Sequence, residues 1–167
     1  MMVLVGGLPG SGKTYFAKRL ASKIDAVWLS SDSVRKSLTA TGKYKLGERM
    51  HIYKELARLA ELRLIEAQNV IIDATFSRQN MRDLFTFLAD KLSVPLHFIW
   101  VYANEELIKE RLQRQRQDSE ADFSVYQKIR DEFDPLNFPF TKIESTNDNV
   151  ESMLKMAEQL ISGNEGK

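Results

Sequence analysis

The residues near the amino terminus form a loop suited to binding phosphate groups. Glycine, lysine and threonine fill the fixed positions of the pattern G-x-x-x-x-G-K-T over residues 7–14. Glycine lets the backbone wrap closely around a polyphosphate, so that N–H groups point inward. The lysine places a positive charge on the outer phosphates, and the threonine hydroxyl is a ligand for Mg²⁺. The residues predicted to bind a nucleotide in this way are Gly7, Pro9, Gly10, Ser11, Gly12, Lys13 and Thr14.

The sequence on either side supplies the context that this loop requires. Apolar residues 2–5 predict a buried strand, and Phe16, Leu20 and Ile24 recur at the spacing of one helix face. The start of such a helix adds unpaired N–H donors and a partial positive charge. A glycine-rich turn can be purely structural, but its position between a strand and a helix favours phosphate binding.

A carboxylate and an arginine follow the second expected strand, residues 26–29. Asp32 and Arg35 are three residues apart and should share a helix face. Asp32 could accept the proton of an attacking hydroxyl as a general base, and Arg35 could hold an anionic group of the acceptor. The alternative is that Asp32 caps the helix and pairs with Arg35.

A second carboxylate ends the apolar run at residues 70–72. Asp73 stands where nucleotide-hydrolysing and nucleotide-transferring enzymes hold the Mg²⁺ water shell, which predicts a metal site made by Thr14 and Asp73. Motor-type ATPases follow this residue with a glutamate that activates water, and here Ala74 follows instead. The pair therefore favours transfer to another acceptor over hydrolysis, although Asp73 could also be a simple loop cap.

Three arginines, Arg111, Arg114 and Arg116, lie one helix after the fourth expected strand. Arg111 and Arg114 should share a helix face because they are three residues apart. Guanidinium groups over a triphosphate would stabilise the charge of the transition state. Such a charged face is often only solvated, but small P-loop kinases carry their lid at this position, so we expect at least one of the three to be catalytic.

Strands and helices alternate along the chain. Expected strands cover residues 2–5, 26–29, 70–72, 96–102 and 140–143, and helical patterns separate them. This alternation predicts a three-layer α/β sandwich, in which a parallel sheet has helices on both faces. The carboxyl ends of parallel strands meet at one edge, which would bring the polar clusters to the phosphate-binding loop.

The helical patterns have defined expected bounds and faces. A short helix is expected over residues 33–39 and a long one over 47–68, and Ser77 and Asn104 are expected to cap the next two. The residues expected on the buried face of the long helix are Ile52, Leu56, Leu59 and Leu62. The apolar residues expected on a further helix are Val125, Ile129 and Phe133.

The composition is that of an ordinary globular protein. The 167 residues suit one domain, which we place at 1–162 with a flexible tail at 163–167. No apolar run reaches the roughly 20 residues that cross a bilayer, and the first strand begins at once, so we expect no membrane contact and no signal peptide. The chain has no cysteine, which fits a cytoplasmic location and excludes disulfides and thiolate chemistry. The net charge of +1 gives no general attraction to nucleic acid, and His51 and His97 are expected to be structural.

In their order and spacing the motifs resemble the P-loop predicted-kinase family, a group of small AAA-type and zeta-toxin-like kinases. The matching stretches are the loop at 7–14, S-S-D-S-V-R at 30–35, V-I-I-D-A-T-F at 70–76 and R-L-x-x-x-R-x-D-x-x-x-D at 111–122. This family is related to the 5′-hydroxyl kinase domain of phage polynucleotide kinase. The resemblance covers about residues 2–162.

The resemblance implies a P-loop NTPase fold with a five-stranded parallel sheet in the order 2-3-1-4-5 and a small helical lid. It also implies ATP and Mg²⁺ as cofactors, with Asp32 as the general base and Asp73 as the acidic residue after strand three. The residues expected to contact the acceptor are Arg35 and Thr75. A lid arginine is expected among residues 111–116.

The acceptor remains open among several hydroxyl compounds. Polynucleotide kinase carries two adjacent acids where this chain has Asp32 followed by serine, so a polynucleotide 5′-hydroxyl, a nucleoside, a sugar and an aminoglycoside-like polyol are all candidates. Lys43, Lys45 and Arg49 could line a groove for an anionic acceptor, with Tyr44 and Tyr53 available to stack on it. The alternative is that this stretch is an exposed loop before a helix. The alternatives to a kinase are a nucleotide-dependent switch or ATPase acting on a macromolecule, and an ATP-binding module without turnover.

Overall fold

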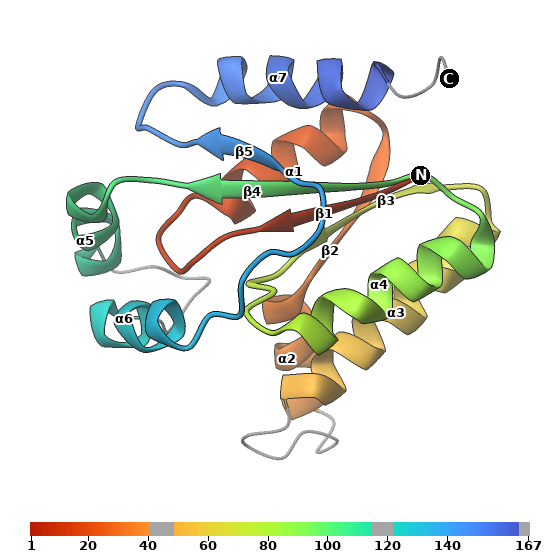
Figure 1. Cartoon of the computed structure of the whole chain (residues 1–167), viewed down its shortest axis with the longest axis horizontal. Coiled ribbons are helices and arrows are strands. Elements are labelled where there is room, and N and C mark those ends of the chain that lie inside the picture. The colour runs from red at the N-terminus through yellow and green to blue at the C-terminus, as the bar shows by residue number, and fades with distance from the viewer. Residues whose placement is uncertain (41–48, 115–121, 164–167) are drawn as a thin grey trace.

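The computed structural model describes residues 1–40, 49–114 and 122–163, which alternate between strands and helices as expected. The strands are β1 (Met2–Gly6), β2 (Ala26–Ser30), β3 (Asn69–Asp73), β4 (Leu96–Tyr102) and β5 (Thr141–Glu144). The helices of the described residues are α1 (Lys13–Lys23), α2 (Ser31–Ala40), α3 (Arg49–Ile65), α4 (Gln79–Leu92), α5 (Glu105–Gln113), α6 (Phe123–Asp131) and α7 (Val150–Ser162). All strands pair in parallel in the order β2-β3-β1-β4-β5, which confirms the predicted sheet (Figure 1).

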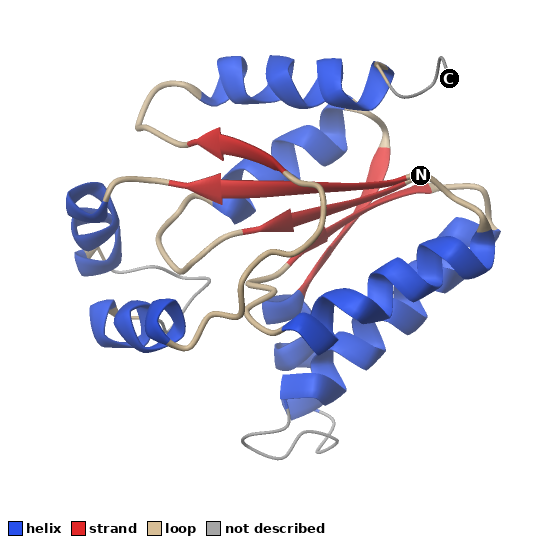
Figure 2. Cartoon of the chain, viewed as in Figure 1, coloured by secondary structure: helices blue, strands red, loops and turns tan. Residues whose placement is uncertain are grey.

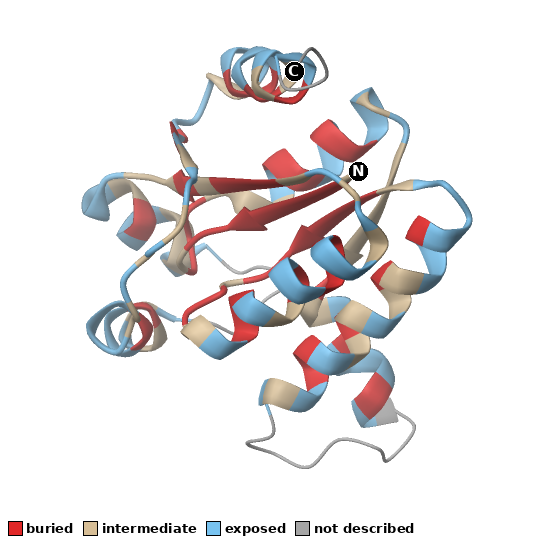
Figure 3. Cartoon of the chain, turned by 45° about the vertical axis from the view of Figure 1, so that its right-hand side comes forward, coloured by how far each residue is buried: buried red, intermediate tan, exposed pale blue. Residues whose placement is uncertain are grey.

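Helices cover both faces of the sheet, so the fold has three layers (Figure 2). Because side chains alternate along a strand, Val3 and Val5 of β1 join the apolar cluster under α1 and α7, whereas Met2 and Leu4 join the one under α3 and α4. Every residue of β1 is buried, as expected for a central strand with both faces covered (Figure 3). Helices α5 and α6 lie beyond the carboxyl ends of the strands, where a small lid was expected (Figure 1).

One expected core residue of α3 is on the surface. Leu62 is 48% exposed, because the buried stripe of this helix passes through Leu56, Ala60 and Leu64 at intervals of four residues. Position 62 follows Ala60 by 200° around the helix axis and therefore faces away from the core. Ile52 and Leu56 are buried as predicted, and Leu59 is half-buried.

Two local details at helix ends also differ from prediction. The N-cap residue of α4 is Arg78, not Ser77, and the Arg78 side chain makes no capping hydrogen bond. The Gln79 N–H donates instead to the Asp134 carboxylate, at 2.9 Å. Phe133 follows the end of α6 and does not belong to it, whereas Asn104 caps α5 as predicted by accepting from the Leu107 N–H.

Helix bounds differ from expectation by a few residues. The short helix begins at Ser31 and not at 33, and the long helix ends at Ile65 and not at 68. The expected start of the long helix at residue 47 lies outside the described residues, as do residues 164–167 of the expected tail. Among the helices that the structure describes, none combines the length and the apolar character that a membrane span needs.

Candidate active site

The loop between β1 and α1 requires its glycines. Gly10 and Gly12 have φ angles of 83° and 91°, in the left-handed region that other residues rarely adopt. A Cβ atom on Gly7 would lie 2.5 Å from the Val101 carbonyl oxygen, and one on Gly12 would lie 2.6 Å from the Ser145 hydroxyl. The backbone is therefore packed too closely for side chains at these positions.

Helix α1 begins directly at the end of this loop, at Lys13. Its N-cap residue is Gly12, which has no side chain to accept a hydrogen bond from the first turn. The first turn of a helix carries N–H groups without partners inside the helix, together with a partial positive charge. The residues predicted to bind phosphate therefore lie at a helix start, a position that favours anions.

Asp73 ends β3 as a buried carboxylate next to this helix start. It is 2% exposed, and its Oδ1 atom makes no hydrogen bond within the described part of the chain. Burial raises the pKa of Asp73, while the positive charge of Lys13 and the Thr14 hydroxyl act in the opposite direction. A buried carboxylate oxygen without a donor, beside a threonine hydroxyl, fits the oxygen ligands that Mg²⁺ prefers.

Asp32 lies in the first turn of α2 and forms an ion pair with Arg35, with Oδ1 and Nη1 2.7 Å apart. Both side chains are partly exposed. The Ser30 hydroxyl accepts from the Ser33 N–H at 3.1 Å, so Ser30 makes the capping contact that was one alternative for Asp32. The negative charge of Asp32 contributes to the raised pKa of Asp73, so the two predicted carboxylates interact across the rim.

Thr75 is half-buried in the loop between β3 and α4. On one side the Ala74 N–H donates to the Val5 carbonyl at 3.3 Å. On the other side Phe76 is fully buried and has a φ angle of 54°, an uncommon conformation for an aromatic residue. Thr75 therefore lies between two fixed backbone positions at the same rim as Asp73.

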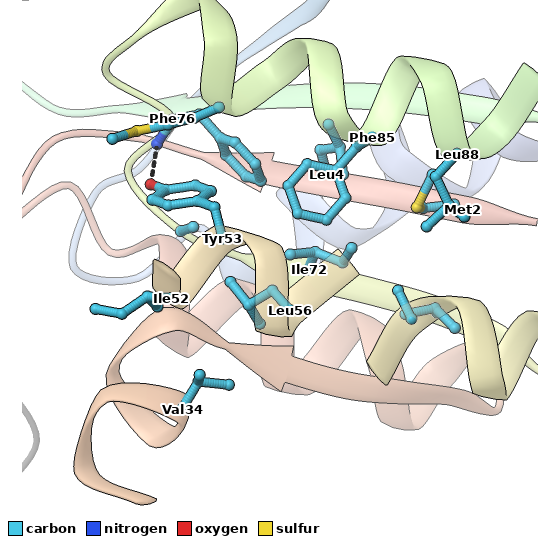
Figure 4. Packing of buried hydrophobic residues seen from close by; sticks show 14 of the residues in the cluster. Met2, Leu4, Val34, Ile52, Tyr53, Leu56, Ile72, Phe76, Phe85 and Leu88 are labelled. Atoms are coloured by element: carbon cyan, nitrogen blue, oxygen red, sulfur yellow. Dashed lines mark hydrogen bonds between the residues drawn. The ribbon is translucent and has the colours of Figure 1, made fainter. Parts of the chain in front are cut away.

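Tyr53 holds this loop from α3 and is not available to stack on an acceptor. The side chain is buried, and its hydroxyl accepts a hydrogen bond from the Phe76 N–H at 2.9 Å (Figure 4). Burial raises the pKa of Tyr53 to about 12, and the charges of Arg35, Arg49 and Asp32 act on it as smaller effects. Of the other residues proposed for an acceptor groove, Arg49 is exposed at the start of α3, and Lys43, Tyr44 and Lys45 lie outside the described residues.

A cavity of about 220 Å³ opens between α2, α3 and the edge strand β2. Its polar lining comes from Ser30, Ser33 and Ser37 on one side and Glu55 on the other, and apolar side chains complete the wall. Ser33 directly follows Asp32 in α2, so the cavity lies next to the expected general base.

The two predicted lid arginines that the structure describes, Arg111 and Arg114, make different contacts. The Arg111 guanidinium donates to the Gly10 and Ser11 carbonyls at 3.3 and 3.2 Å, and to the Thr146 carbonyl at 2.7 Å. Arg114 forms an ion pair with Glu110 on the exposed side of α5, and Arg116 lies outside the described residues. Arg111 thus joins α5, the phosphate-binding loop and the segment after β5, and its catalytic role stays a prediction.

Two residues at the rim were not singled out from the sequence. Ser145 directly follows β5, is buried, and accepts from Arg111 at 3.1 Å. Its signal was the one used for Asp32 and Asp73, a polar residue directly after a strand. Arg82 is 1% exposed within α4, and burial lowers its pKa. In the sequence, Arg82 is recognisable only as a charged residue next to the apolar face of an expected helix.

Comparison with known proteins places the chain in a family. The family model described as an AAA domain matches residues 2–136, and the chain belongs to this family. The uncharacterized protein Rv2004c of Mycobacterium tuberculosis (strain ATCC 25618 / H37Rv) is 32% identical over 93 residues, which cover 48% of this chain and 19% of that protein. The chain therefore spans about a fifth of the length of the curated relatives that it matches.

Solved structures share the fold at low sequence identity. A sugar kinase from Janibacter sp. HTCC2649 is 20% identical with a TM-score of 0.72, over 96% of this chain and 94% of that one. The APS kinase CysC of M. tuberculosis, in complex with AMPPNP and APS, is 16% identical with a TM-score of 0.73, over 96% of each chain. Kti12 of Chaetomium thermophilum, in complex with ADP-AlF3, is 16% identical with a TM-score of 0.73, over 95% and 98%. The chain has the α/β fold of P-loop kinases.

Proposed function

We propose that the protein is a kinase that transfers the γ-phosphoryl group of ATP to a hydroxyl acceptor in the presence of Mg²⁺. The observation that carries this proposal is the buried Asp73 carboxylate beside Lys13 and Thr14, with Asp32 near it and Ala74 following it. The fold shared with structures named sugar kinase and APS kinase supports the same class of reaction.

The donor half of the proposed site is the loop and the start of α1. The backbone N–H groups of the loop and the Lys13 ammonium would bind the phosphates and hold the γ-phosphorus for in-line attack. Thr14 and Asp73 would hold Mg²⁺, whose charge offsets that of the phosphates. Arg111, already bound to the loop carbonyls, would keep the loop in this shape when the nucleotide leaves.

The acceptor half is formed by Asp32, Arg35 and Thr75. The acceptor oxygen attacks the γ-phosphorus, its proton passes to the Asp32 carboxylate, and the bond between the γ-phosphorus and the bridging oxygen breaks to release ADP. Arg35 would orient the Asp32 carboxylate through their 2.7 Å contact. Since Ala74 cannot activate water, the arrangement favours an alcohol over water as the nucleophile. The acceptor is one of the candidate hydroxyl compounds: a polynucleotide 5′ end, a nucleoside, a sugar or another polyol.

The Asp32→Asn variant separates nucleotide binding from phosphoryl transfer. The amide keeps the size of the side chain but cannot accept the proton, so we expect transfer to fall at least about 100-fold. ATP affinity, measured by calorimetric titration, should change little because Lys13 and the loop are untouched.

The matched control is Asp25→Asn. Asp25 is an exposed acid in the turn before β2, and asparagine tolerates its φ angle of 50°. This variant should transfer phosphate at the wild-type rate. Undiminished transfer by Asp32→Asn would remove Asp32 from the role of general base.

A further inference from the structure

The largest fully buried side chain of the described residues carries a charge. Arg82 lies in α4 between Met81 and Phe85, both of which are buried. Burying an ionised group is costly unless its hydrogen bonds are replaced, and an apolar side chain of similar volume is often the more stable choice. Packing alone therefore does not account for arginine at this position.

The Arg82 guanidinium joins two segments that are far apart in sequence. Nη1 donates to the Phe76 carbonyl at 2.9 Å and to the Asp134 carbonyl at 3.1 Å. Nη2 donates to the Gln79 side chain at 2.9 Å and to the Pro135 carbonyl at 2.8 Å. None of these four acceptors is a carboxylate. The planar fork of arginine can bind several carbonyls at fixed angles, which a lysine ammonium cannot reproduce.

The first of the two segments is the loop that carries the predicted acceptor contact. Phe76 has a left-handed backbone, which persists in a non-glycine residue only when surrounding contacts enforce it. Here the Tyr53 hydroxyl binds its N–H, Arg82 binds its carbonyl, and its ring packs edge-on against Phe85 at 5.5 Å. Thr75 is the residue directly before this fixed position.

The second segment leads from α6 back to the sheet. The Asp134 N–H donates to the Ser77 carbonyl at 2.9 Å, and the Asp134 carboxylate binds the Gln79 N–H and Arg78. One residue earlier, Phe133 packs on Trp100 of β4 with ring centres 4.9 Å apart. The exit from α6 is thus bound to the start of α4 through side-chain and backbone contacts.

We infer that Arg82 is a positioning residue for the acceptor half of the site. By binding the Phe76 carbonyl and the carbonyls of Asp134 and Pro135 together, it fixes Thr75 at the rim and ties the acceptor loop to the exit from α6. The inference rests on the proposed function, because Thr75 is taken as the residue that contacts the acceptor. Arg82 is 1% exposed, so in this inference it acts on the acceptor only through Thr75.

Kinetics of Arg82→Lys and Arg82→Met test this role. With an acceptor that the wild type phosphorylates, we expect kcat/KM for the acceptor to fall at least tenfold, while KM for ATP stays within twofold. The control is Arg78→Lys, because the 42% exposed Arg78 side chain binds the carboxylates of Asp134 and Glu132, and a lysine can keep such ion pairs. It should behave like the wild type. Equal losses for acceptor and ATP in the Arg82 variants would overturn the inference.

Hydrogen exchange tests the same role without any acceptor. In both Arg82 variants the peptides over residues 74–80 and 132–138 should exchange faster, and the peptide over 6–16 should not. ATP affinity should be unchanged. This result supports the positioning role even if the wild type phosphorylates nothing, which would contradict only the proposed function.

Two outcomes of the exchange experiment would overturn the inference. One is wild-type exchange at 74–80 in both variants, which would show that other contacts hold the loop. The other is loss of the folded state in both, as seen by circular dichroism, which would make Arg82 a requirement for folding and not for positioning.

Discussion

At the scale of single residues, the role proposed for Asp73 in binding Mg²⁺ conflicts with the stability of the empty protein. Burial raises its pKa, so the folded protein holds this proton more tightly than the unfolded chain. The contribution of Asp73 to stability is then largest at low pH and decreases as the pH rises above its ordinary value of 3.8. Ionising this buried carboxyl group, whose Oδ1 atom accepts no hydrogen bond in the described part of the chain, therefore costs stability.

Replacing this carboxylate by an amide should therefore stabilise the empty protein. We expect Asp73→Asn to raise the melting temperature at pH 7, by about 2–4 °C for each 1 kcal/mol gained, and to lose this advantage below about pH 4. Scanning calorimetry across this pH range measures the effect. Adding ATP and Mg²⁺ should stabilise the wild type more than the variant. A lower melting temperature for Asp73→Asn at pH 7 would show that the ionised carboxylate is well compensated.

The buried Tyr53 hydroxyl should make the free energy of unfolding depend on pH in a defined way. Tyr53→Phe leaves the buried Phe76 N–H without its acceptor, which should cost about 1–3 kcal/mol of unfolding free energy at pH 7. Above pH 10 the unfolded wild type releases the tyrosine proton, whereas the folded wild type keeps it until about pH 12. The unfolding free energy of the wild type therefore decreases as the pH rises from 10 to about 12, and the variant, which lacks this hydroxyl, does not show this decrease.

The wild type and Tyr53→Phe should therefore differ less in unfolding free energy at pH 11 than at pH 7, by about 1.4 kcal/mol. This amount corresponds to one pKa unit, because pH 11 lies one unit above the ordinary pKa of tyrosine. Urea unfolding at pH 7 and pH 11 gives the two differences. Effects of the other tyrosines cancel because both proteins contain them. A gap that is constant or wider at pH 11 would contradict the assigned burial of this hydroxyl.

At the scale of elements, the start of α4 depends on a residue far away in sequence. Asp134 accepts from the first N–H of the helix and comes 55 residues later than Gln79. A side chain that satisfies a helix N-terminus contributes about 0.5–2 kcal/mol. Asp134→Ala should lose this amount and the contact with Arg78. Ser77→Ala should cost less, because Ser77 is not the N-cap residue of α4.

Chemical unfolding of the two alanine variants distinguishes the local from the distant cap. A larger loss for Ser77→Ala than for Asp134→Ala would restore the cap that the sequence pattern indicated. Each change removes a polar side chain beside the same helix start, which Ser77 adjoins in sequence and Asp134 reaches in space.

The elements also show where prediction from sequence succeeds. Strand and helix types were correct, because each apolar run and each helical repeat depends on neighbouring residues. The buried face of α3 was assigned in the wrong phase at Leu62, since small Ala60 and polar-tipped Tyr53 form part of its core stripe. The cap of α4 and the burial of Arg82 were missed because both depend on residues 132–135, which no local pattern connects to α4.

At the scale of the whole molecule, the position of the candidate site follows from the topology. In a parallel sheet ordered β2-β3-β1-β4-β5, the residues after β1, β2 and β3 meet at one edge. The alternation of strands and helices in the sequence is therefore enough to assign Asp32 and Asp73 to the rim of the phosphate-binding loop. It is not enough to assign the path of Arg111, because a helix face alone does not show whether a guanidinium binds a ligand or the loop itself.

The proposed function divides the candidate site into a donor half and an acceptor half. The donor half is built on α1 and is braced by Arg111 of α5. The acceptor half is built on α2 and the β3–α4 loop and is braced by Arg82. Variants of the two arginines should therefore affect different substrates, ATP in the first case and the acceptor in the second.

The central claim is that a phosphoryl group passes from ATP to an alcohol. The most direct measurement incubates the purified protein, Mg²⁺ and γ-labelled ATP with a panel of 5′-hydroxyl oligonucleotides, nucleosides, sugars and aminoglycosides, and uses Lys13→Ala as the blank. We predict that label appears on at least one hydroxyl acceptor with the wild type and not with Lys13→Ala. Label recovered only as inorganic phosphate, at a rate that no acceptor changes, would contradict the claim and favour a nucleotide-dependent switch or ATPase.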